Sequence, residues 1–93
     1  MDREKLKRSH AHSCADQCRE MGLVVGDVIV GREEHSGGKW SEAELTVIFI
    51  GQDVVVFSQR TRSFLAEEWI NFGESGNWML YFRDWYKINK GQT

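Results

Sequence analysis

Apolar residues are most concentrated in the stretch Leu45–Ser58, where two runs of β-branched and aromatic side chains flank a glycine. A glycine that can open a two-residue turn between two such runs predicts a β-hairpin. With Gly51 and Gln52 at the centre of the turn, Ile50 pairs with Asp53, Phe49 with Val54 and Val47 with Val56. Both faces of this hairpin are mainly apolar, so we expect each face to be covered.

The chain before the hairpin predicts one helix over residues 2–21, within an N-terminal segment of residues 1–22. A weak apolar stripe has the helical spacings of three, four and seven, and consists of Leu6, Ala11, Cys14, Ala15, Cys18 and Met21. Gly22 follows the last apolar position and is expected to end the helix. A helix this polar is marginal alone, so we expect it to cover one face of the hairpin.

The remaining apolar runs predict short strands separated by polar turns. Besides the hairpin, the expected strands are Val28–Arg32, Trp78–Phe82 and Trp85–Ile88, and the expected loops and turns are Glu33–Lys39, Ser58–Ser63 and Gly73–Asn77. The segment Phe64–Phe72 favours a short helical turn or irregular structure, although its bulky residues also fit a strand. The whole is one α+β domain over residues 1–93: the helix, a β-rich core at 23–88 that forms a five-stranded antiparallel barrel or curled sheet, and a tail at 89–93.

Two resemblances extend this picture. The run Val25-Gly26-Asp27-Val28-Ile29-Val30 resembles the first strand of SH3-like barrels of the Tudor and KOW type, and the meander order of the strands agrees with that type. The chain also looks like the short accessory proteins of phages and prophages, which are often small, proline-poor and rich in tryptophan. That likeness implies a protein that binds and modulates a host component, such as a defence or transcription factor.

Charge and composition exclude several classes of protein. The formal net charge is −2, which gives no field strong enough to argue for nucleic acid or an anionic membrane. No run approaches the roughly 20 apolar residues that a membrane span needs. The charged first 20 residues contain no secretory signal, and the two cysteines are no disulfide framework. We therefore expect a cytoplasmic protein with no membrane partner.

One cluster near the N-terminus has the chemistry of a metal site. On a helix, His10, Cys14 and Cys18 recur every four residues, and zinc accepts imidazole and thiolate ligands in mixed sets. This spacing matches no common zinc-ribbon pattern, and the three side chains would fan around the helix. The alternative is that both cysteines act as small apolar residues that pack the helix on the sheet. We expect no cofactor, with zinc kept as the alternative.

The aromatic residues form the second candidate site. Aromatics beyond the needs of a small core, together with two arginines, are the candidate binding residues: Trp40, Arg60, Arg62, Trp69, Trp78, Tyr81, Trp85 and Tyr86. Exposed aromatics can form a protein-binding hot spot, stack single-stranded bases or make a cation cage. They can also simply fill the core. The net acidity of the β-rich part argues against nucleic acid, since phosphate neutralisation drives that binding.

The sequence holds no recognisable catalytic motif, because neither a phosphate loop nor a converging pair of carboxylates is present. The leading hypothesis is therefore a non-enzymatic protein-binding module whose partner is a host protein. Nucleic-acid binding through Arg60, Arg62 and the aromatic strands is the alternative. A homodimer is compatible with both hypotheses, because the helix covers only one of the two apolar hairpin faces.

Overall fold

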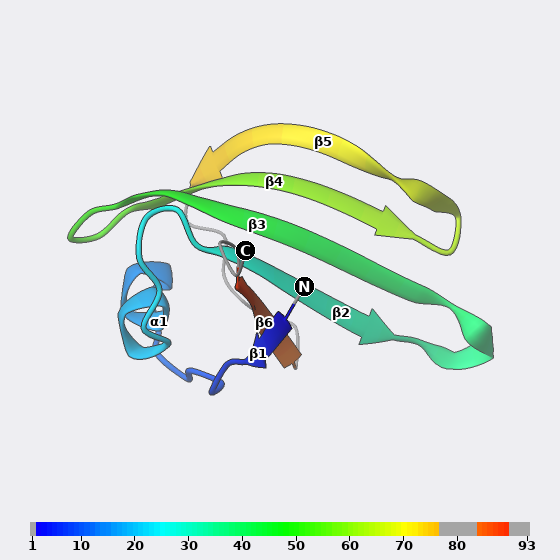
Figure 1. Cartoon of the computed structure of the whole chain (residues 1–93), viewed down its shortest axis with the longest axis horizontal. Helices are drawn as coiled ribbons and strands as arrows, with labels where there is room; N and C mark the ends of the chain where they lie inside the picture. Colours follow the sequence, from blue (N-terminus) through cyan, green and yellow to red (C-terminus); the bar gives the residue numbers. More distant parts are fainter. Residues whose placement is uncertain (1, 77–83, 90–93) are drawn as a thin grey trace.

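In the part of the chain that the structure describes, the protein forms a single antiparallel sheet with one short α-helix on one face (Figure 1). The computed structural model describes residues 2–76 and 84–89. The elements in chain order are β1 (Asp2–Lys5), α1 (Cys14–Glu20), β2 (Val28–Glu34), a 3-10 turn η1 (Ser36–Gly38), β3 (Trp40–Ile50), β4 (Val55–Ser63), β5 (Ala66–Gly76) and β6 (Asp84–Asn89). The strand order is β1-β6-β2-β3-β4-β5, so β1 and β5 lie at the two edges.

The predicted fold class, an N-terminal helix followed by a five-stranded antiparallel SH3-like barrel or curled sheet, is wrong. The sheet has six strands in the described residues. The start of the predicted helix forms β1 instead, in which Arg3 pairs with Ile88 and Lys5 with Tyr86. The helix begins only at Cys14, because the Ser13 side chain caps it by accepting a hydrogen bond from the Asp16 backbone N–H at 3.1 Å. Only the last third of the predicted helix is therefore helical.

The predicted end of the helix at Gly22 is confirmed. Gly22 has a φ of +72°, which favours glycine. Its N–H donates to the carbonyl of Arg19 at 3.1 Å, and the Leu23 N–H donates to that of Cys18 at 2.9 Å. This pair of bonds is the Schellman motif, which satisfies the last helical carbonyls and turns the chain toward the sheet.

The central hairpin is confirmed as β3–β4, but its predicted register is wrong. Ile50 pairs with Val55, so four residues form the loop, and a bulge at Ile48 shifts the pairing between Val47 and Phe49. The shift places Val55 and Phe57 opposite the inward side of β3, where both are fully buried. The packing of these two side chains offsets the free-energy cost of the irregular strand pairing. The same shift in register leaves Phe49 53% exposed.

The second half of the hairpin is longer than the sequence pattern predicted. The segment Ser58–Ser63, predicted as a polar connection, completes β4, and most of Phe64–Phe72 belongs to β5 rather than to a helical turn. Cross-strand ion pairs stabilise this polar part of β4, and hydrophobic periodicity does not reveal them. The turn predicted from Gly73 is instead a bulge within β5, where Gly73 has a φ of +77°.

The strands predicted at Val28–Arg32 and Trp85–Ile88 are confirmed as β2 and β6. The strand predicted at Trp78–Phe82 and residues 90–93 of the predicted tail lie outside the described residues.

The core lies between α1 and one face of the sheet. Its buried members are Cys14, Ala15, Cys18, Leu23, Ile29, Ala43, Leu45, Val47, Val55, Phe57 and Trp85. A smaller buried cluster on another part of the sheet contains Val28, Val30 and Ile88. Within residues 2–76 and 84–89, no helix has the length and apolarity needed to cross a membrane.

Candidate binding surface

Three arginines and two tryptophans line up across one face of the sheet, from β2 to β5. We call Arg32, Trp40, Arg62, Trp69 and Arg60 the Arg–Trp array. The pairing of strands explains the alignment: Arg32 and Arg62 are both cross-strand partners of Glu42, and Arg60 is the partner of Glu44. Side chains two apart on a strand share a face, so these charged residues converge on one side of the sheet.

Each tryptophan of the array contacts two guanidinium groups. The Cζ of Arg32 lies 4.3 Å from the centroid of Trp40, and that of Arg62 lies 5.6 Å from the same ring. The Cζ atoms of Arg60 and Arg62 both lie 4.7 Å from the Trp69 centroid. All four distances are within the range of cation–π attraction, and Arg62 links the two rings.

The carboxylates beneath the array hold the guanidinium groups in place. Arg62 donates from Nε to Glu42 Oε1 at 2.5 Å, and Glu42 is only 4% exposed. Arg60 donates two hydrogen bonds to Glu44, at 2.9 and 3.0 Å. The hydrogen bond between Arg32 and Glu34 raises the pKa of the Arg32 guanidinium.

These contacts balance the charge of the array. The Nη1 atom of Arg32 also lies 3.8 Å from Oε2 of Glu42. Three guanidinium groups are thus matched by three carboxylates. The array is a rigid, nearly neutral surface rather than a phosphate-binding patch.

The structure brings together four of the eight predicted binding residues: Trp40, Arg60, Arg62 and Trp69. Trp85 is 3% exposed and belongs to the core, and Tyr86 lies half-buried on β6, between Lys5 and Val30. Trp78 and Tyr81 lie outside the described residues.

Sequence reasoning missed Arg32, Glu42 and Glu44. The signal that could have identified them is a matching spacing: two glutamates, Glu42 and Glu44, are two residues apart on one arm of the hairpin, and Arg60 and Arg62 are two apart on the other. It becomes visible only when the hairpin register is correct.

The adjacent edge of the sheet is formed by β5, and much of it is exposed. In the described residues β5 pairs only with β4. Ile70 and Phe72 are 47% and 58% exposed, and Leu65 in the preceding turn is 82% exposed. Unpaired edge strands of this length are usually covered or blocked by charge, because their free N–H and C=O groups can pair with another strand.

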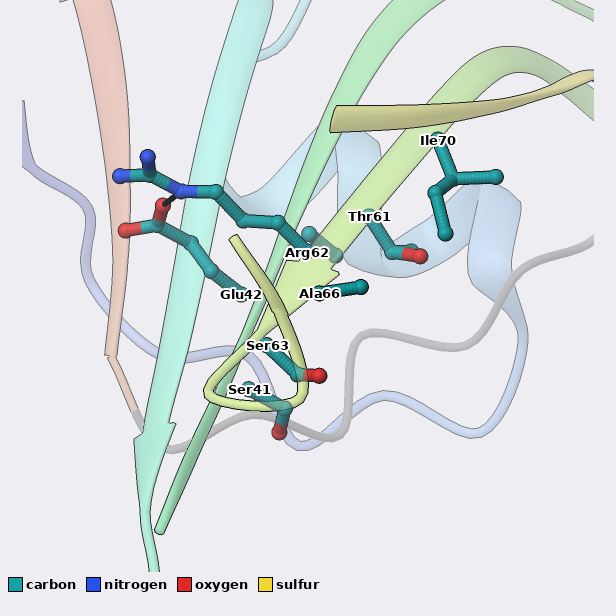
Figure 2. A pocket seen from close by; sticks show the side chains of 8 residues that line it. Ser41, Glu42, Thr61, Arg62, Ser63, Ala66 and Ile70 are labelled. Atoms are coloured by element: carbon teal, nitrogen blue, oxygen red, sulfur yellow. Dashed lines mark hydrogen bonds and ion pairs between the residues drawn. The ribbon is translucent and has the colours of Figure 1, made fainter. Parts of the chain in front are cut away.

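A cavity of about 230 Å³ lies beside this edge (Figure 2). The end of β4 and the start of β5, which help to line it, lie at the end of the sheet away from α1 (Figure 1). Its lining residues come from β3, β4 and β5 and are mostly small: Ser41, Glu42, Ala43, Thr61, Arg62, Ser63, Ala66 and Ile70. Figure 2 shows the paired side chains of Glu42 and Arg62 extending away from Thr61, Ala66 and Ile70. The cavity and the Arg–Trp array therefore lie on opposite sides of the same strands.

The predicted metal ligands are not brought together. His10 is exposed in the segment before α1, whereas Cys14 and Cys18 are buried against the sheet. A hydrogen bond between the two thiols raises the pKa of Cys18, as does its burial, and lowers that of Cys14. In the part of the chain that the structure describes, no three His, Cys, Asp or Glu residues are grouped for a metal ion. The burial of the cysteines fits the alternative prediction, in which they pack the helix.

Comparison with protein-family models, curated proteins and solved structures finds no match.

Proposed function

We propose that this protein is a non-enzymatic protein-binding module that binds an extended segment of its partner along β5. The observation that carries the proposal is an 11-residue edge strand, Ala66–Gly76, with exposed apolar side chains and no strand on its outer side in the described residues. An extended segment can add to such an edge by main-chain hydrogen bonds, while side chains on alternate positions give specificity.

The Arg–Trp array supports this role, because it makes the neighbouring strands rigid. Trp69 of β5 packs against Arg60 and Arg62 of β4, so one face of the edge strand is fixed to the rest of the sheet. A strand that is already extended and held in place loses less conformational entropy when a partner binds.

Nucleic acid is a poorer fit to the same surface. Arg60 and Arg62 are engaged by Glu44 and Glu42, so they offer little uncompensated positive charge. The edge strand carries three glutamates, which would repel phosphates. That the partner is a host protein, and that this is a phage-type accessory protein in the cytoplasm, stay predictions from the sequence.

The first prediction concerns capture of the partner. We expect the double variant Ile70→Lys, Phe72→Lys to lose partner retained from bacterial lysate by about tenfold or more, since buried apolar anchors dominate protein interfaces. The bound complex should show slowed hydrogen exchange in β5. Quantitative pull-down followed by hydrogen-exchange mass spectrometry measures both effects.

The matched control is Val24→Lys, Val25→Lys, because these two residues are 60% and 59% exposed in the turn after α1, away from the cavity end of β5. The control should bind as the wild type does. Equal loss in both variants, or protection only outside β5, would contradict the proposal.

A further inference from the structure

We infer that the segment that pairs with β5 is basic and inserts one apolar side chain into the cavity beside Ala66. This inference rests on the proposed function, and it specifies the chemistry of the partner: an extended peptide in which lysine or arginine alternates with apolar residues. Two independent observations, the charge of the edge and the size of the cavity, lead to it.

The edge strand is uniformly acidic. Glu67, Glu68 and Glu74 are its only charged residues, and all three are exposed. None of them forms an ion pair with another described residue, whereas the arginines of β4 are engaged by the carboxylates of β3. Opposite charges on paired strands attract and like charges repel, so β5 favours a basic strand over an acidic one.

The cavity has the size of a side-chain site rather than a metabolite site. Its volume of about 230 Å³ is below the roughly 300–1,000 Å³ of typical small-molecule pockets, yet far above the space of one water. Its lining includes the apolar residues Ala43, Ala66 and Ile70. These walls suit an aliphatic or aromatic side chain.

The cavity opens next to the edge where the partner would lie. Ala66 and Ile70 belong to β5 itself and line the cavity, so the cavity reaches the edge strand along which the partner would lie. Alternate side chains of an added strand point to the same face of the sheet. One side chain of the added strand can therefore extend over Ala66 into the cavity, while basic side chains at the neighbouring positions of that strand lie near the glutamates of β5.

The test uses three fluorescently labelled nine-residue peptides, each with a leucine at its centre. In the first peptide valine alternates with lysine, in the second with glutamate and in the third with serine. Fluorescence anisotropy measures affinity, and amide chemical shifts of the full-length protein locate binding. We expect the lysine peptide to bind along β5 at least about tenfold more tightly than the other two. Its advantage should shrink as salt rises from about 50 mM to about 500 mM.

Two variants separate the two contributions. The triple variant Glu67→Gln, Glu68→Gln, Glu74→Gln should remove the preference for the lysine peptide. A fourth peptide, the lysine sequence with a central alanine, should bind the wild type more weakly than the leucine version. Ala66→Leu should remove this difference, because it fills the opening of the cavity. All four substitutions are at exposed positions, so the fold should be retained in both variants.

Each outcome has a distinct meaning. If all three peptides perturb β5 equally, the inference is overturned while strand addition stands. If the lysine peptide binds away from β5, the inference is overturned, and the pull-down with hydrogen exchange decides the proposed function separately. If none of the peptides binds at millimolar concentration, the inference falls, and the pull-down decides the proposed function separately.

Discussion

At the scale of single residues, Glu42 organises the Arg–Trp array. It is the most buried charged side chain of the described residues, at 4% exposure, and it faces Arg62 and Arg32 on the two neighbouring strands. A buried carboxylate is stable only when its oxygens are hydrogen-bonded or paired. Glu42 therefore fixes two guanidinium groups, which in turn fix Trp40.

We predict that Glu42→Gln lowers the free energy of unfolding by about 1–3 kcal/mol, because it removes charge-assisted hydrogen bonds and leaves two arginines less compensated. Urea denaturation followed by tryptophan fluorescence measures the change.

The control for this substitution is Glu34→Gln. Glu34 also pairs with Arg32, but its side chain is 68% exposed, so the loss should stay below about 1 kcal/mol. Equal losses in the two variants would show that burial of Glu42 is not what makes its contacts important.

At the scale of elements, Arg19 joins the short helix to the central hairpin. Its guanidinium donates to Asp16 Oδ1 at 2.6 Å, and also to the carbonyls of Gly51 and Gln52 at 3.2 and 3.1 Å. Asp16 thus orients the side chain that connects α1 to the β3–β4 loop. The contacts are exposed, so their contribution depends on solvent conditions.

This connection should depend on pH. The hydrogen bond from Arg19, with a further one involving Ser13, lowers the pKa of the Asp16 carboxyl. A lowered pKa in the folded state gives stability that is present above the unfolded value of about 3.9 and is lost as the pH falls through the folded value. We predict that Asp16→Asn reduces the urea midpoint at neutral pH, and that the difference from wild type disappears in strong acid.

Urea titrations at several pH values measure the effect on the midpoint. Asp53→Asn, at an exposed position in the hairpin loop, is the control and should change little. A deficit of Asp16→Asn that persists in strong acid would mean that the charge of Asp16 does not act through Arg19.

The hydrophobic pattern predicted the elements whose structure is determined by their own residues. The runs at Val28–Arg32 and Trp85–Ile88 are strands because buried β-branched and aromatic residues dominate them, and Gly22 ends the helix because its φ is positive. The hairpin itself was predicted correctly. Its register was not, since the bulge at Ile48 depends on how Val55 and Phe57 pack under α1.

The elements that were missed depend on distant partners. Nothing local makes Asp2–Lys5 extended: it is a strand because β6 lies beside it. The polar part of β4 is extended because Glu42 and Glu44 face Arg62 and Arg60. The strand β5 is extended because it pairs with β4. For the same reason the sequence identified Trp40, Trp69, Arg60 and Arg62 as candidates, but not Arg32 or the carboxylates Glu42 and Glu44.

At the scale of the whole molecule, the acidic edge bears on self-association. A homodimer, which the sequence leaves open, would most simply form by antiparallel pairing of two β5 edges. In the register centred on Asn71, that pairing places Glu68 opposite Glu74 of the second copy, and like charges directly opposite destabilise a strand pair. Charge on β5 therefore opposes assembly through this edge.

We predict that Glu67→Gln, Glu68→Gln, Glu74→Gln promotes dimers at low salt, whereas the wild type does not dimerise through β5. Sedimentation velocity across a range of concentrations measures this. The control Glu33→Gln, Glu34→Gln, Asp53→Asn removes the same charge from exposed positions elsewhere and should behave as the wild type. Dimers in both triple variants would point to net charge rather than to the edge.

The position of β6 has a consequence for how the chain folds. It lies between β1 and β2, and Ile88 is the cross-strand partner of both Arg3 and Val28 (Figure 1). The β2–β5 strands are joined by local connections and can assemble early, but contacts between residues this far apart in the chain form slowly. A nascent chain therefore carries β1 and one side of β2 unpaired until β6 has been synthesised, and this interval is when non-native pairing competes most strongly with folding.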